Sequence, residues 1–301
     1  MIDLLIETPA LFTALALLIG LIVGSFLNVV IHRVPIMLDR EWREQCAEYA
    51  GDTIEADRKP FNLLRPGSSC PACKAHIPAW QNIPILSYIL LRGRCAACGA
   101  SISIRYPIVE GLTALASAAV AWKFGFGAAG IAGIVLTWFL IALTFIDIDH
   151  QLLPDVLTLP LLWLGLALST LVGTFDLAPS GALAIPVDLR ASVIGAMAGY
   201  LSLWSIYHLF RLATGKEGMG YGDFKLLAAL GAWMGWKMLV PIVLISAAVG
   251  AVTGIILLAL QRRHRSTPIP FGPFLAAAGW LMLLFGPELV ETYLGVFGPR
   301  L

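Results

Sequence analysis

The sequence predicts an all-α protein that crosses a membrane about eight times, with a cytoplasmic insertion between its first two helices. Its 301 residues are 58% hydrophobic and only 13% charged, with a mean hydropathy of +0.83, whereas a soluble domain carries about 25% charged residues. The apolar residues form long runs with short polar breaks, and the charges gather between residues 33 and 105. This composition excludes a disordered chain, a collagen-like chain and a disulfide-rich secreted module.

Eight apolar segments predict the membrane-crossing helices, because a helix needs about 20 apolar residues to span a bilayer. The stretch 226–260 is too long for one helix, and we expect it to break at Gly235-Trp236-Lys237 into a short sixth helix and a full seventh. The other six segments are expected at about 9–31, 106–121, 128–146, 156–173, 189–210 and 271–285.

Basic residues orient these helices, because cytoplasmic loops carry an excess of Lys and Arg. Ten of the twenty Lys and Arg lie between Arg33 and Arg105, and sixteen fall on the inner side when the N-terminus is placed outside. The expected organisation is a first transmembrane helix at 1–32, a cytoplasmic insertion at 33–105 and a transmembrane domain of about seven helices at 106–301. The net charge of +1 gives no indication of a nucleic-acid partner, and we expect none.

Four cysteines in the insertion form a C-x2-C-x21-C-x2-C pattern: Cys70, Cys73, Cys95 and Cys98. Two CxxC turns can each direct two sulfurs at one point, as a tetrahedral Zn²⁺ requires, and four thiolates without an open position are typical of a structural zinc site. Two disulfides, a redox pair or unrelated thiols are the alternatives, although disulfides are rare in the cytoplasm. Cys46 remains as an expected free thiol.

Two acids lie at the predicted inner edge of the membrane, where charged groups are costly and therefore rare. Asp147 follows an apolar helix, and Asp223 precedes another, so the two are expected at the same depth. Two neighbouring carboxylates share a proton, and such a pair can act as base and acid on a water molecule. Asp149 and Asp155 are also nearby, but solvation or helix capping explains them equally well.

Glycines at positions 218, 220 and 222 permit an unwound or sharply turned backbone just before Asp223. Irregular backbone near the membrane survives where it lines a cavity or is buried in protein. The run contains neither GK[ST] nor GxGxxG, so it does not indicate a nucleotide-binding loop. A proton-coupled transporter that uses both aspartates, and a scaffold held by the cysteine segment, remain as alternatives to an enzyme.

Three motifs together resemble the prepilin peptidases of type IV pilus and type II secretion systems. The first is GSFLNVVIHRVP at 24–35, and the second is the two-CxxC segment with its continuation to Glu110. The third is the acid pair, Asp147 in a D-x-D-x-x-x-L-P-D element and Asp223 in a GxGD element. The resemblance covers residues 24–225, and it extends to other GxGD aspartic membrane proteases such as presenilin.

The resemblance implies a bifunctional enzyme of the bacterial inner membrane, with a periplasmic N-terminus and a cytoplasmic active site. Such enzymes cut the leader from prepilins and pseudopilins after a Gly. They then methylate the new N-terminal residue, usually Phe, with S-adenosylmethionine. Asp147 and Asp223 carry over as the catalytic aspartates, because the first family aspartate lies seven residues before the LP proline. The cysteine segment is absent from peptidase-only relatives, so its presence supports the methyltransferase activity.

One aspartate would activate water as a general base while the other, protonated, polarises the scissile carbonyl. The pair titrates as a unit, so the sequence does not assign the two roles. The hydrophobic helix of a pilin would dock laterally through the lipid. No Rossmann-type fingerprint marks the S-adenosylmethionine-binding residues. Five polar residues near the inner surface are candidates either for substrate or cofactor binding or for interfacial anchoring: His32, Arg33, Asn82, Arg92 and Arg105.

Overall fold

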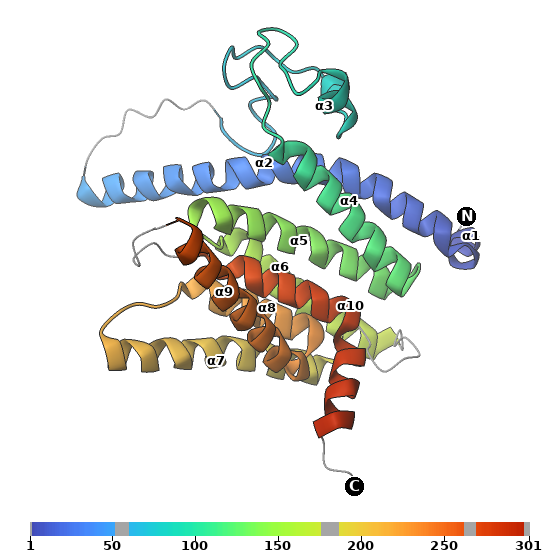
Figure 1. The fold of residues 1–301 in the computed structure, drawn as a ribbon, viewed down its shortest axis with the longest axis vertical. Coiled ribbons are helices and arrows are strands. Elements are labelled where there is room, and N and C mark those ends of the chain that lie inside the picture. The colour runs from blue at the N-terminus through green and yellow to red at the C-terminus, as the bar shows by residue number, and fades with distance from the viewer. Residues whose placement is uncertain (1, 52–59, 176–186, 262–268, 298–301) are drawn as a thin grey trace. The chain divides into compact units, whose positions relative to one another are not determined.

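The computed structural model describes residues 2–51, 60–175, 187–261 and 269–297. Within these ranges the regular elements are helices (Figure 1), which confirms the all-α class. The chain divides into two compact units, residues 1–122 and 123–301.

The first unit is built on two long helices that flank the cysteine-bearing segment. Its elements are α1 (Ile2–Glu7), α2 (Pro9–Ala50), the 3₁₀ helix η1 (Ala79–Asn82), α3 (Leu86–Leu90) and most of α4 (Arg105–Phe124). Helix α2 is longer than the apolar run that predicted it. The charged residues after Arg33 are mostly good helix formers, and the helix ends only at Gly51, whose φ of 73° supplies a left-handed C-cap. The predicted insertion therefore begins as a helix.

Two glycines let α2 approach the backbone of α4. A Cβ at Gly20 would lie 2.7 Å from the Ala114 Cα, and one at Gly24 would lie 2.7 Å from the Glu110 Cα. Both distances are shorter than any real side chain tolerates. A pair of small residues four positions apart is a common way for membrane helices to pack closely.

The second unit contains six α-helices among the described residues, at each place where the sequence predicts one. These are α5 (Ala128–His150), α6 (Asp155–Phe175), α7 (Leu189–Thr214), α8 (Tyr221–Met234), α9 (Leu239–Gln261) and α10 (Gly272–Phe297), with a 3₁₀ turn η2 (Trp236–Met238) before α9. The predicted break is confirmed, because α8 ends at Gly235, whose φ is 77°. Helix α8 starts five residues earlier than expected and so includes Asp223.

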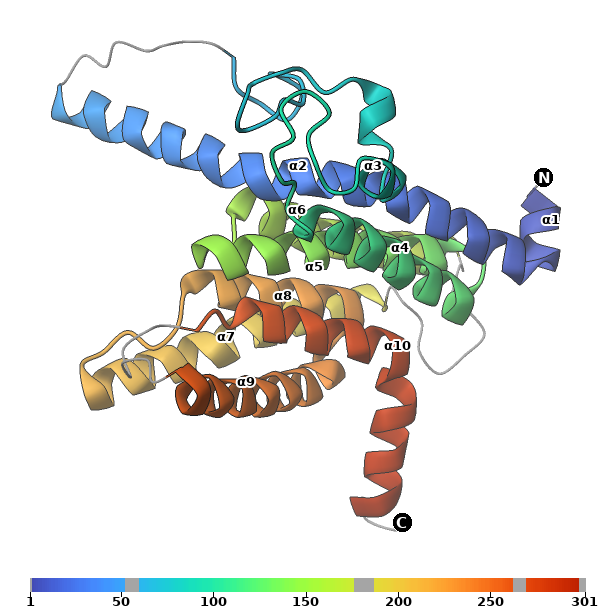
Figure 2. The same cartoon turned by 45° about the horizontal axis from the view of Figure 1, so that its top comes forward.

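Helix α8 forms the core of this unit and packs against α6, α7 and α10 (Figures 1 and 2). Its residues from Leu226 to Met234 are all buried. Trp233 is fully buried and its indole N–H donates a 2.8 Å hydrogen bond to the Leu161 carbonyl of α6. Glycines at 195 and 231 allow α7 and α8 to cross in direct backbone contact. The short helix that carries Asp223 is therefore held firmly on several sides.

Four helices are long and apolar enough to cross a membrane, judged by length and composition within the described residues: Pro9–Ala50, Ala128–His150, Leu189–Thr214 and Trp236–Leu257. Two shorter apolar helices are Asp155–Leu171 and Gly272–Gly286. This agrees with a polytopic membrane protein. The basic residues at 262–265, which contribute to the predicted orientation, lie outside the described residues.

Candidate active site and metal site

Asp147 lies in the last turn of α5, and its side chain is buried with only 5% of the residue exposed. The helix ends because Gln151 adopts a left-handed conformation and donates its backbone N–H to the Asp147 carbonyl at 2.9 Å. The side-chain Oδ2 accepts a 3.0 Å hydrogen bond from the backbone N–H of Gly272. The N-terminus of α10 therefore holds this carboxylate in place.

Asp223 lies in the first turn of α8 and is 7% exposed. The non-helical residues 215–220 lead into this turn, and the Asp223 backbone N–H donates to the Gly220 carbonyl at 3.3 Å. The sequence places Asp147 and Asp223 at opposite ends of two different helices. The structure brings these ends together.

Both aspartates line one cavity of about 270 Å³. The two carboxylates are close enough for their charges to repel each other. The remaining lining residues come from the α5–α6 connection, the turn before α8 and the start of α10: Gln151, Leu153, Glu217, Gly218, Met219, Gly220, Gly222, Ile269, Pro270 and Phe271. The expected irregular backbone before Asp223 therefore does line a cavity.

Two glycines near the turn also act through their small size. Gly220 has an ordinary φ of −82°, and Gly222 is already helical. A Cβ at Gly222 would lie 2.6 Å from the Leu153 Cβ, and one at Gly218 would lie 3.0 Å from the Phe210 ring. Gly222 thus lets the LP element pack directly against the first turn of α8, beside Asp223.

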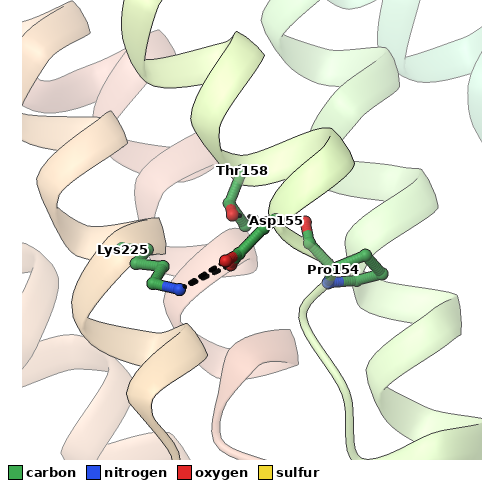
Figure 3. A network of polar contacts seen from close by, with 4 residues as sticks. All are labelled: Pro154, Asp155, Thr158 and Lys225. Atoms are coloured by element: carbon green, nitrogen blue, oxygen red, sulfur yellow. Dashed lines mark hydrogen bonds and ion pairs between the residues drawn. The ribbon is translucent and has the colours of Figure 1, made fainter. Parts of the chain in front are cut away.

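The two acids near the catalytic candidates, Asp149 and Asp155, do not line the cavity. Asp149 is exposed on α5, whereas Asp147 is buried. Asp155 begins α6 after Pro154, and both of its carboxylate oxygens pair with Lys225 Nζ of α8, at 2.6 and 2.7 Å (Figure 3). Asp155 is therefore neither simply solvated nor part of the cavity. It joins the two elements that border the site.

This arrangement can perform acid–base chemistry on a water molecule. The cavity is large enough for water and a peptide group, and two carboxylates are the only ionisable side chains buried among its described lining residues. Two close carboxylates favour a state with one shared proton. One can then remove a proton from water while the other donates a hydrogen bond to a carbonyl oxygen.

The four cysteines of the first unit come together in one cluster. Their sulfur atoms all lie within 4.8 Å of one another, and this set of ligands can hold a metal ion. The two CxxC turns have the same backbone hydrogen bond, from the residue after the second cysteine to the carbonyl of the first. Lys74 N–H donates to the Cys70 carbonyl and Gly99 N–H donates to the Cys95 carbonyl, each at 2.9 Å. Lys74 and Gly99 each have a positive φ, 60° and 71°.

The spacing of one sulfur pair, Cys70 and Cys98, matches that of two ligands on a tetrahedral ion of the size of zinc. A Zn–S distance of about 2.3 Å places two ligands of a tetrahedron about 3.8 Å apart, and the sulfurs of Cys70 and Cys98 are 3.8 Å apart. A disulfide bond is only about 2.05 Å long, and all five cysteines are free. Backbone N–H groups of Cys73 and Ala72 lower the pKa of the Cys70 thiol to about 6, which favours a thiolate at this position, whereas the hydrogen bond with Cys73 raises the pKa of Cys98 to about 11. Cys46 is exposed on α2 and remote from the cluster in sequence.

The polar residues predicted near the inner surface differ in their surroundings. Arg33 donates to the carbonyl oxygens of Asn62 at 2.8 Å and Pro66 at 2.7 Å, so it fixes the chain just before the first CxxC turn. His32, Asn82 and Arg92 are exposed, and Arg105 begins α4.

The sequence alone assigns no role to two further residues at these sites, Gly272 and Glu110. Gly272 contacts Asp147. Its place in a PFGP stretch before an apolar helix is the sequence feature that indicates a specialised turn there. Glu110 is 8% exposed in α4 and accepts the Ile85 backbone N–H at 2.7 Å. A lone acid within an apolar run, which costs free energy unless it has a partner, was the signal there.

Two family models match the chain, and the gap between them lies near the boundary between the two compact units. Residues 18–124 match the family model described as the bacterial peptidase A24 N-terminal domain. Residues 134–255 match the model of the type IV leader peptidase family. No solved structure matches the chain.

Relatives from several bacteria match almost the whole chain, and each bears the name prepilin leader peptidase/N-methyltransferase. The protein from Stutzerimonas stutzeri is 52% identical over 97% of this chain and 97% of its own. That from Aeromonas hydrophila is 55% identical over 96% of both chains. That from Pseudomonas aeruginosa is 50% identical over 99% of both. With two family models and such relatives along its length, the chain belongs to the type IV leader peptidase family.

Proposed function

We propose that this protein is a membrane-embedded aspartic endopeptidase that removes the leader from type IV prepilins and type II secretion pseudopilins, and an N-methyltransferase that modifies the new N-terminus. The names of relatives about 50% identical over nearly the full length support both activities. The single observation that carries the peptidase activity is the meeting of Asp147 and Asp223 in one cavity.

The two carboxyl groups would share the work of hydrolysis. One takes a proton from a water molecule, and the oxygen of that water forms a bond to the scissile carbonyl carbon. The other carboxyl, protonated, donates a hydrogen bond to the carbonyl oxygen as negative charge develops there. The C–N bond then breaks, and the leaving amine takes a proton from the pair. The base that accepted the proton from water can supply it, so the pair returns to its starting state.

The leader junction would enter the cavity from the cytoplasm, while the apolar helix of the prepilin remains in the lipid. The excess of Lys and Arg on the connections of this side supports a cytoplasmic active site in the bacterial inner membrane, with the N-terminus in the periplasm. The residues that line the cavity come from helix ends and connections and not from helix centres, as a site at the membrane surface requires.

The four cysteines would hold one structural Zn²⁺. Their type, number and spacing fit this ion, and with four thiolates around it no position remains for substrate. The metal would fix two turns that are separated by more than twenty residues and contain little regular structure. The methyl donor would be S-adenosylmethionine, as the methyltransferase name implies; the described residues contain no strand–loop–helix nucleotide site to which it can be assigned.

The test is cleavage of a prepilin by the purified full chain in detergent, followed by gel or mass spectrometry. We expect Asp147→Asn and Asp223→Asn to lower the cleavage rate by at least about a thousandfold, since each removes one of two groups needed in the transition state. Expression and membrane insertion should be unchanged.

Asp149→Asn is the matched control, because Asp149 is an exposed aspartate two residues away on the same helix. It should keep substantial activity. Near-parental cleavage by Asp147→Asn would show that the assignment of the catalytic pair is mistaken.

A further inference from the structure

We propose that Gly272 is a positioning residue for the reaction, which orients the Asp147 carboxylate through its backbone N–H and through its lack of a side chain. This inference rests on the proposed role of Asp147. It concerns a third element of the site, the start of α10, which lies 125 residues further along the chain.

The first argument is the hydrogen bond. Gly272 is the first residue of α10, and the first N–H groups of a helix have no partner within it. The next residue, Pro273, has no N–H at all. The Gly272 N–H is therefore free to donate to Asp147 Oδ2, at 3.0 Å. A buried donor of this kind holds one oxygen of the carboxylate, so the other oxygen, Oδ1, is left for water or substrate.

The second argument is space. A Cβ at position 272 would lie 2.6 Å from Asp147 Oδ2 and 3.1 Å from Leu153 Cδ1. A side chain there must displace the carboxylate, because the oxygen lies at less than van der Waals distance. Only glycine combines the N–H that proline lacks with the space that other residues would occupy.

The third argument is the surroundings of the contact. The Leu153 side chain lies against both Gly222 and Gly272, where a Cβ would come within 2.6 Å and 3.1 Å of it. It thus fills the space between the α8 turn that carries Asp223 and the α10 terminus that holds Asp147. Pro270 and Phe271, the residues before Gly272, line the cavity itself. The start of α10 therefore forms one wall of the site and fixes the geometry of one carboxylate in it.

The experiment compares Gly272→Ala with Gly279→Ala in the purified full chain. Gly279 lies on the same helix, and the atoms nearest to a Cβ there belong to the buried Leu230 side chain, at 2.7–3.3 Å, and not to an aspartate. For Gly272→Ala we expect prepilin cleavage with kcat at least about a hundredfold lower and KM changed less than about twofold, because a misplaced catalytic group affects the chemical step and not substrate binding. Gly279→Ala should keep kcat near the parental value. Equal losses in the two variants, or an unchanged kcat in Gly272→Ala, would overturn the proposal.

A double-mutant cycle of thermal stability tests the contact between Gly272 and Asp147 independently of activity. Gly272→Ala should lower the thermal unfolding temperature of the parental protein, and it should do so much less in an Asp147→Ala background, where the crowded carboxylate is gone. In a Leu153→Ala background the penalty should persist. A penalty that disappears only with Leu153→Ala would show that Gly272 serves packing and not the carboxylate. If Asp147→Asn still cleaves prepilin while the cycle shows coupling, the proposed function fails and the contact stands.

Discussion

Lys225 and Asp155 form an ion pair that joins the N-terminal parts of α8 and α6, with Nζ 2.6 Å from one carboxylate oxygen and 2.7 Å from the other. Lys225 follows Asp223 by two residues, and Asp155 follows Leu153 by two. The pair therefore connects the GxGD and LPD elements at a point just outside the cavity. A lysine that meets both oxygens in this way links the two helix ends.

Reversal of charge should show what this pair contributes. Lys225→Asp places two negative charges opposite each other and should lower the unfolding temperature by about 2–4 °C, because a partly exposed pair is worth about 1 kcal/mol or less. Cleavage should fall several-fold. The double variant Asp155→Lys with Lys225→Asp should regain most of both losses. If each single reversal behaves like the parental protein, the pair does not organise the site.

Glu110 should stabilise the segment between the two CxxC turns. It accepts the backbone N–H of Ile85, a residue that has a positive φ of 58° and directly precedes α3. Glu110→Ala would leave this donor without a partner, at a cost of about 1–3 kcal/mol. We expect a lower unfolding temperature and faster proteolysis near α3. Glu110→Gln, which keeps an acceptor oxygen of the same shape, should lose much less, and equal losses in both variants would show that the hydrogen bond to Ile85 is not the cause.

The cysteine cluster should bind one zinc ion per chain. Elemental analysis of purified protein should give close to one equivalent, and Cys73→Ser should lose it because the site then lacks one of four thiolates. In such sites the binding energy is also folding energy, about 10–16 kcal/mol in isolated zinc fingers, so the variant should be cut rapidly by protease between residues 60 and 104. Cys46→Ser is the control and should retain the metal. Two disulfides found by mass spectrometry would contradict both the zinc site and its cytoplasmic location.

The sequence predicts the helices well because hydropathy and helix length are local properties. The break at Gly235 and the helix at each of the eight predicted places follow from them. Hydropathy does not predict the continuation of α2 beyond Arg33, because charged residues interrupt the apolar ones from Asp39 to Ala50. The sequence predicts that Asp147 and Asp223 lie at helix ends for the same reason, since this depends on their distance from apolar runs.

The contacts that organise the site could not be predicted, because they join residues far apart in the chain. Gly272 meets Asp147 across 125 residues, and Lys225 meets Asp155 across 70. No periodicity or spacing links such pairs. The sequence favours a glycine at 222 for its backbone freedom, whereas in the structure Gly222 allows close packing against Leu153.

The last prediction separates the two proposed activities. Methyl transfer must follow cleavage, because the acceptor is the amine that cleavage creates: the carbon–sulfur bond of the donor sulfonium breaks, a nitrogen–carbon bond forms, and the amine loses a proton. An Asp223→Asn protein should therefore fail to methylate full-length prepilin. It should still methylate a pilin that was cut beforehand, because the cysteine segment belongs to one compact unit and the aspartates belong to the other.

The measurement is the transfer of a labelled methyl group to mature pilin by Asp223→Asn protein in detergent. Damage to the cysteine segment should have the opposite effect, so Cys73→Ser should lower methylation more than cleavage. Parental protein supplied with mature pilin gives the reference rate, and a zinc measurement on each sample shows that the segment is folded. If folded, zinc-loaded Asp223→Asn protein transfers no methyl group to mature pilin, then methylation also needs the aspartate, and the two activities do not occupy separate sites.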